Sequence, residues 1–228
     1  ASSNGSFQLN LWIPDPAPIR DADNEAAVRT FLGQWGPDVA TDAGDAAPPD
    51  FDAQCNAMLA AGPSVISSIM GLYPEPFVAR MKAQGVKWFA TVTTVAEAKA
   101  AADAGADVIV AQGMEAGGHR GAFEADQAER ALVGLFSLVP AVCDAVELPV
   151  VATGGIADAR GVAAALMLGA SAAQIGTGCY ARRKPLSCPP GRTRLVIQRR
   201  KIPLSRVPSP VAPAAVWPPP MPARRTAP

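Results

Sequence analysis

Short β-branched runs alternate with segments of helical period over residues 7–180, and this alternation restricts the folds open to the chain. Three of the helical segments end on a glycine, at Gly85, Gly105 and Gly169, and an apolar run follows each one. Glycine adopts the left-handed conformation that ends many helices, so each glycine predicts a helix end directly before a strand. Repeated βα units of this kind build a parallel sheet with helices between its strands. We therefore expect an α/β fold.

Six strands are predicted, and the segments between them are predicted helices. Thr94 and Glu97 have the spacing of a capping box, and Asp158 is a predicted N-cap, so helices should begin directly after Thr94 and Asp158. A chain of 228 residues is close to the roughly 250 of a (β/α)8 barrel. The expected strands are Phe7–Ile13, Ser64–Ser68, Lys87–Val92, Asp107–Ala111, Val150–Thr153 and Ala172–Ile175.

The last part of the chain has a different composition from the rest. Residues 182–228 hold 11 of the 20 Lys and Arg residues and none of the 20 Asp and Glu residues, and they are rich in proline. We therefore expect two domains, a folded body over 1–181 and a basic tail over 182–228. Two interpretations of the tail remain: a disordered, solvated extension, and translation in a changed reading frame, which we favour. Binding of nucleic acid by the tail would be non-specific.

Cysteine usage and the chain start bear on the cellular compartment. Four cysteines lie at spacings that fit neither a metal site nor a disulfide scaffold, which favours free thiols in a reducing compartment. No apolar run approaches the roughly 18 residues of a membrane span, and the first residues do not resemble a signal peptide. We expect a cytoplasmic protein without a membrane anchor, and its first residues suggest a start inside a longer gene.

Two consecutive strand ends carry groups suited to a phosphate. The strand at 150–153 ends in Gly154 and Gly155, and the strand at 172–175 ends in Gly176 and Thr177. Glycines let a phosphate approach the backbone N–H groups, and a helix N-terminus after Asp158 would add to the site. The alternative is that these glycines only permit tight turns. Two such ends in succession favour a phosphate site at the end of a barrel.

A glycine-rich loop follows the strand at 107–111 and contains His119, the only histidine of the chain. Backbone of such a loop can approach a flat ligand, and imidazole titrates near neutral pH, so we interpret His119 as catalytic rather than structural. Glu115 and Arg120 on the same loop are open to the simpler interpretation of solvated charges. No cluster of ligating residues supports a metal site.

Asn10 interrupts an otherwise apolar strand. If that strand is buried, the Asn10 amide needs hydrogen-bond partners, and either a ligand or an internal partner would serve. The two alternatives are evenly balanced.

These segments resemble the flavin-dependent nitronate monooxygenases, formerly called 2-nitropropane dioxygenases. The resemblance covers about residues 7–178, and it is specific to this family and to close flavin barrels such as FMN-type enoyl reductases. The motifs that carry it are residues 90–98, 105–121 with Ala-Gly-Gly-His at 116–119, 149–158 with Gly-Gly-Ile at 154–156, and 168–177 with Gln-Ile-Gly-Thr at 174–177.

The resemblance implies an FMN-dependent oxidoreductase that converts alkyl nitronates or nitroalkanes and O2 to carbonyl compounds and nitrite. It implies a (β/α)8 TIM-barrel type fold that is incomplete here, with about six βα units and the first two missing. It makes His119 the base or hydrogen-bond donor at the substrate nitro group. It assigns Gly154, Gly155, Gly176 and Thr177 to the FMN phosphate, and Asn10, Gln112 and Gly118 to the flavin ring.

Other functions stay open beside this one. An incomplete barrel exposes two parallel edges, so an inactive fragment is one alternative. A second is an FMN-dependent enoyl-thioester reductase or NAD(P)H:quinone reductase of the same barrel type. A third, from another class, is a phosphate-binding scaffold without redox chemistry. The substrate within its class and the oligomeric state are not predicted.

Overall fold

The computed structural model describes residues 7–17, 19–177 and 194–197. The chain divides into two compact units, residues 1–198 and 199–228, and every described residue lies in the first. The expected domain boundary after residue 181 and most of the tail over 182–228 lie outside the described residues. Both therefore stay predictions, except at residues 194–197.

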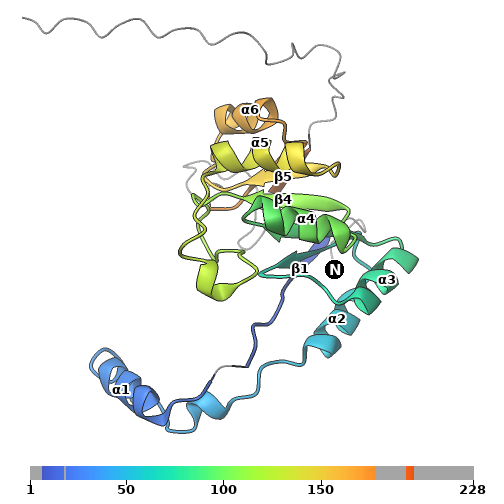
Figure 1. Cartoon of the computed structure of the whole chain (residues 1–228). Helices are drawn as coiled ribbons and strands as arrows, with labels where there is room; N and C mark the ends of the chain where they lie inside the picture. Colours follow the sequence, from blue (N-terminus) through green and yellow to red (C-terminus); the bar gives the residue numbers. More distant parts are fainter. Residues whose placement is uncertain (1–6, 18, 178–193, 198–228) are drawn as a thin grey trace, which may run out of the picture. The chain divides into compact units, whose positions relative to one another are not determined.

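The described residues contain seven strands in one sheet, and the first six are parallel and follow one another in chain order (Figure 1). With helices between strands, this is the arrangement of a TIM-type barrel, and it confirms the predicted fold class. Every expected strand lies within one residue of its predicted bounds. The strands are β1 (Gln8–Trp12), β2 (Val65–Ile69), β3 (Lys87–Val92), β4 (Val108–Gln112), β5 (Val150–Thr153), β6 (Ala172–Ile175) and β7 (Arg194–Ile197).

The seventh strand was not expected. β7 pairs antiparallel with β6, from a tail in which the sequence analysis predicted no regular structure. A strand at the edge of a sheet presents unpaired N–H and C=O groups, and a short extended run can pair with them without a helical crossover. Pairing of this kind leaves little signal in composition.

Six helices are described, and their ends follow the local signals in the sequence. The capping box of Thr94 and Glu97 and the N-cap of Asp158 are both present. Gly85, Gly105 and Gly169 have positive φ and follow the ends of three helices, as predicted. The helices are α1 (Ala22–Leu32), α2 (Phe51–Ala60), α3 (Glu75–Ala83), α4 (Val95–Asp103), α5 (Leu135–Ala145) and α6 (Ala159–Met167), with 3-10 turns η1 (Ala43–Asp45) and η2 (Ala125–Gln127).

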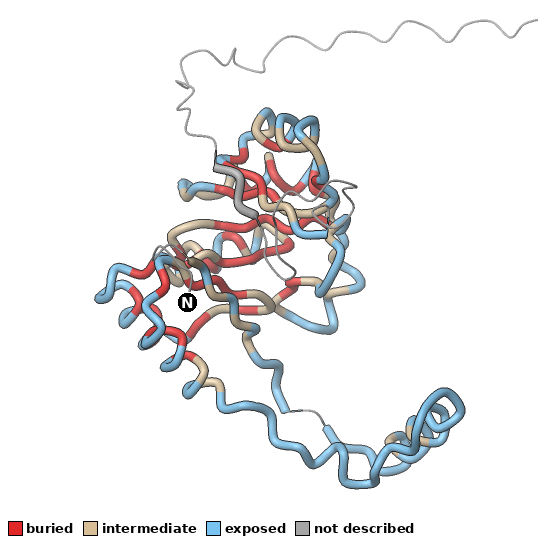
Figure 2. The backbone as a smooth tube through the Cα atoms, turned by 180° about the vertical axis from the view of Figure 1, so that it is seen from behind, coloured by how far each residue is buried: buried red, intermediate tan, exposed pale blue. Residues whose placement is uncertain are grey.

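The two faces of the sheet differ in what covers them. On the face that we call the outer face, alternate strand residues such as Ile66, Trp88 and Ile109 join residues of α2 to α6 in one large core. In Figure 2, buried positions are drawn in red along the strands of the sheet. The inner face has only a small cluster, centred on Val110 and Val151 and including Ala172. Its residues at the carboxyl ends of the strands are mostly polar.

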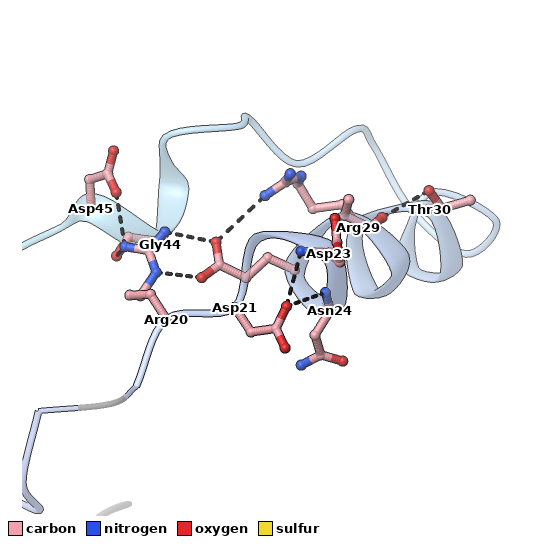
Figure 3. A network of polar contacts seen from close by, with 10 residues as sticks. Arg20, Asp21, Asp23, Asn24, Arg29, Thr30, Gly44 and Asp45 are labelled. Carbon is pink, nitrogen blue, oxygen red and sulfur yellow. Dashed lines mark hydrogen bonds and ion pairs between the residues drawn. The ribbon is translucent and has the colours of Figure 1, made fainter.

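A separate network of polar contacts lies within the long connection between β1 and β2. The Arg20 guanidinium donates to the Glu25 carboxylate of α1, and its Nη1 donates to the Gly44 carbonyl oxygen and the Asp45 carboxylate at 2.9 Å each (Figure 3). These bonds tie α1 to η1. No residue of α1 is buried.

Candidate functional site

A pocket of about 260 Å³ lies at the carboxyl ends of β5 and β6. It is lined by three segments that are far apart in the sequence: the loop after β4 and the turns after β5 and β6. All four residues that the sequence assigns to a phosphate are brought together here. The lining comprises Glu115, Ala116, Gly117, Thr153, Gly154, Gly155, Ile156, Ala157, Gln174, Gly176 and Thr177.

Two glycines of the pocket allow a close approach of neighbouring groups, backbone at Gly154 and a side chain at Gly117. A Cβ atom on Gly154 would lie 3.2 Å from the Ala116 nitrogen, and one on Gly117 would lie 2.8 Å from the Thr177 Oγ1 atom. A Cβ atom on Gly176, in contrast, would meet no atom of the described residues within 4 Å. Among the described residues, the backbone at Gly176 therefore borders open space, and Gly176 belongs to the pocket lining.

The helix N-terminus expected at this site is already occupied by the chain itself. The Asp158 carboxylate accepts from the backbone N–H groups of Arg160 and Gly161 at 2.9 and 3.3 Å. Its hydrogen bonds to the Arg160 side chain and to these two N–H groups lower the Asp158 pKa to about 2. These first N–H groups of α6 are thus bonded to a carboxylate, which corrects the expectation that they would hold a phosphate.

Glu115 is exposed, as a solvated charge would be, and its carboxylate also has a hydrogen-bond partner within the fold. Both of its carboxylate oxygens accept from the Leu135 backbone N–H, at 2.9 and 3.0 Å. Leu135 begins α5, whose N-cap Gly134 has no side chain to offer. Glu115 therefore caps α5 and fixes the glycine-rich loop beside the pocket.

Gln112 holds the same loop on both sides of Arg120. Its Nε2 atom donates to the His119 carbonyl oxygen at 3.0 Å, and its Oε1 atom accepts from the Gly121 N–H at 2.8 Å. Gln112 is buried at the end of β4. Its amide thus positions the backbone next to His119, in addition to any contact with a ligand.

Arg120, in contrast, is partly buried and is not a solvated charge. Its Nη1 and Nη2 atoms donate to the carbonyl oxygens of Gln112 and Ala131, at 3.1 and 2.8 Å, and its Nε atom is buried without a partner. Burial lowers the pKa of the guanidinium, and the charges of Glu97 and Glu115 partly oppose this. Arg120 thus joins the end of β4 to the segment before α5.

His119 itself is exposed and lies beside Trp12 of β1. The centroids of the imidazole and indole rings are 4.3 Å apart, and the ring planes are inclined by 48°. Gly118, with a φ of 122°, precedes His119 in a conformation that favours glycine. The loop after β4 therefore reaches across the inner face to the first strand of the sheet.

Asn10 lies on β1, two residues before Trp12 and on the same face. Its Oδ1 atom accepts from the Ser67 hydroxyl at 2.8 Å, and its side chain is exposed. Of the two alternatives for Asn10, the internal partner is present. It does not line the pocket at β5 and β6.

No group of three or more His, Cys, Asp or Glu side chains in the described part of the chain is arranged to hold a metal ion. Over the same residues, no helix has both the length and the apolar composition that a membrane crossing requires.

The sequence of the chain also matches a known protein family. The family model for nitronate monooxygenase matches residues 2–181. The chain belongs to the nitronate monooxygenase family. A probable nitronate monooxygenase of Staphylococcus aureus (strain Newman) is 50% identical over 107 residues, which are 47% of this chain and 30% of that protein.

Two solved structures have a similar fold. A nitroalkane oxidase from Streptomyces ansochromogenes is 35% identical, with a TM-score of 0.64, over 75% of this chain and 50% of that chain. A FabK mutant from Thermotoga maritima is 32% identical, with a TM-score of 0.50, over 69% of this chain and 49% of that chain. The chain thus matches at most half the length of each of these three proteins.

The sequence analysis did not identify Trp12 as part of the site, and it did not predict the hydrogen-bond partners of Glu115 and Arg120. Trp12 follows Asn10 by two positions, so the period of a strand already placed both on one face. The partners of Glu115 and Arg120 lie 20 and 11 residues further along the chain, and no local pattern predicts such contacts.

Proposed function

We propose that this chain binds FMN and takes part in the oxidation of alkyl nitronates by O2 to carbonyl compounds and nitrite. Membership of the nitronate monooxygenase family supports the flavin and the substrate class. The likeness to a solved nitroalkane oxidase supports the same chemistry. The observation that carries the proposal is the glycine-lined pocket at β5 and β6, on the same sheet edge as the loop that carries His119.

The pocket fits the phosphate end of FMN. Open space next to Gly176 leaves room for a phosphate against the backbone, and the Thr177 hydroxyl adds a hydrogen-bond donor. No Lys or Arg lines the pocket, so backbone N–H groups would supply most of the donors. The Glu115 carboxylate, the one charge in the lining, is bound to the N-terminus of α5.

His119 supplies the proton chemistry in this proposal. The imidazole is exposed at the carboxyl edge, where it can take an α-proton from a nitroalkane when neutral and bind a nitronate oxygen when protonated. The Gln112 side chain binds the His119 carbonyl oxygen and the Gly121 N–H, and Arg120 donates to the Gln112 carbonyl oxygen. Bound FMN would carry electrons from the substrate to O2.

Substitution of His119 tests this role. We expect His119→Ala to lower turnover of nitroalkane by roughly 10²–10⁴-fold, the usual size of a lost acid or base, at unchanged flavin content. Nitrite formation and O2 consumption per bound flavin give the rate. Flavin loss with unchanged turnover per bound flavin would reject the role of His119.

The other candidate functions differ in their reactants. Oxidation of NADH or NADPH by an enoyl thioester or a quinone, without nitrite formation, would favour a reductase. Binding of phosphorylated ligands without binding of flavin would favour a non-redox scaffold. We also propose that the chain acts in the cytoplasm and that O2 is the oxidant.

A further inference from the structure

Trp12 is the largest apolar side chain that the inner face leaves open. It is 52% exposed at the carboxyl end of β1, where it pairs in register with Ile69 of β2. Packing in the core therefore does not account for its size. Its one aromatic neighbour among the described residues is the His119 imidazole, with ring centroids 4.3 Å apart.

Hydrogen bonds hold the backbone of β1 and the backbone of the loop after β4, which carry the two rings of this contact. Pairing of β1 with β2 continues past Trp12, because the Ile13 N–H donates to the Ile69 carbonyl oxygen at 3.0 Å. On the other side, the Gln112 amide binds the His119 carbonyl oxygen and the Gly121 N–H. The backbones that carry both rings are thus held by hydrogen bonds.

The absence of a side chain at Gly121 lets the loop reach β1. A Cβ atom there would lie 3.1 Å from Ile69 Cγ1 and 3.2 Å from Thr91 Cγ2, at the ends of β2 and β3. The loop after β4 therefore packs over these two strand ends at Gly121, directly after it places His119 against the first strand. Trp12 is the side chain that meets the imidazole there.

We propose that Trp12 is a positioning residue that sets the orientation of the His119 imidazole at the carboxyl edge. The indole face contacts the imidazole when it is neutral and attracts it as a cation when it is protonated. Backbone hydrogen bonds leave the two side-chain torsions of His119 free, and the ring contact restricts them. The effect on turnover rests on the proposed function, whereas the orientation of the ring does not.

The single histidine makes the orientation measurable. In the purified chain at fixed pH, the NMR signals of the imidazole protons belong to His119 alone. We expect them to be displaced by the indole ring current relative to a short peptide of the same local sequence. Trp12→Leu should remove the displacement, Trp12→Phe should keep part of it, and Trp35→Leu, at a side chain 77% exposed in the connection after α1, should leave it unchanged.

Turnover provides the second measurement. With flavin bound, Trp12→Leu should lower kcat for a nitronate on the order of tenfold with little change in KM, and Trp12→Phe should recover most of the loss. Imidazole signals that do not differ between the wild type and Trp12→Leu would overturn the proposal, as would an unchanged kcat in Trp12→Leu. A wild-type chain with flavin but without turnover would contradict the proposed function instead, and the NMR comparison would then decide the role of Trp12 alone.

Discussion

The two faces of the sheet use the same strands for different purposes. Val150 and Val151 are neighbours in β5, both buried, yet Val150 belongs to the large outer core and Val151 to the small inner cluster. In β3 to β6, outer positions continue as apolar residues along the whole strand. Inner positions change to polar residues at the carboxyl end, where Gln112, Thr153 and Gln174 stand in register. The outer face stabilises the fold, and the inner edge carries the site.

The largest stability effect is expected on the outer face. Trp88 is 1% exposed and its indole N–H donates to the Ser68 hydroxyl at 3.0 Å. Trp88→Ala should lower the free energy of unfolding by about 3–5 kcal/mol, measured by urea denaturation. Trp35→Ala, at an exposed tryptophan, should change it by less than about 0.5 kcal/mol. Equal effects of the two changes would remove the distinction between core and surface.

A substitution at the inner edge should weaken FMN binding rather than lower the stability of the fold. Gly176→Val would add a branched side chain to the pocket lining, at a residue without positive φ and without a close neighbour among the described residues. We expect on the order of 100-fold weaker FMN binding, about 2.8 kcal/mol, with the unfolding midpoint almost unchanged. Flavin fluorescence titration measures the first quantity. Gly36→Val, at another open glycine outside the pocket, is the control, and equal FMN affinity in both variants would contradict the pocket.

Substitution of the adjacent valines Val150 and Val151 of β5 compares the packing of the two faces most directly. Val150→Ala and Val151→Ala each remove two methyl groups, worth about 1.6 kcal/mol of buried apolar surface. Val150→Ala should cost more in urea denaturation, because the large outer core relaxes less around a cavity than a cluster of few residues. The opposite order would mean that the inner cluster is the more tightly packed of the two.

The smallest expected effect is on the free energy of unfolding at alkaline pH. Burial in the outer core raises the Cys55 pKa from 9.0 to about 11, with a smaller contribution from Asp52. Above about pH 9 the unfolded chain releases this proton while the folded chain keeps it, so stability should fall as the pH rises toward 11. Cys55→Ala should make this fall shallower in urea denaturation. Identical pH dependence in both proteins would show that Cys55 keeps its ordinary pKa.

Local signals made most of the fold predictable. The capping box of Thr94 and Glu97 spans four residues, and the helix-ending glycines act within one turn, so both could be identified without tertiary structure. The pocket was predictable in part, because parallel strands bring Gly154 and Gly176 to one edge. The contact of Trp12 with His119 was not, since it depends on how one loop packs over two strand ends.

The phosphate pocket is the central claim, and the affinities of FMN and riboflavin for the purified chain test it most directly. The two ligands share the flavin ring and differ in the phosphate. Tighter binding of FMN by at least tenfold, about 1.4 kcal/mol, is the predicted result, and Gly176→Val should remove the difference. Equal affinities of FMN and riboflavin for the wild-type chain would contradict a phosphate site at β5 and β6.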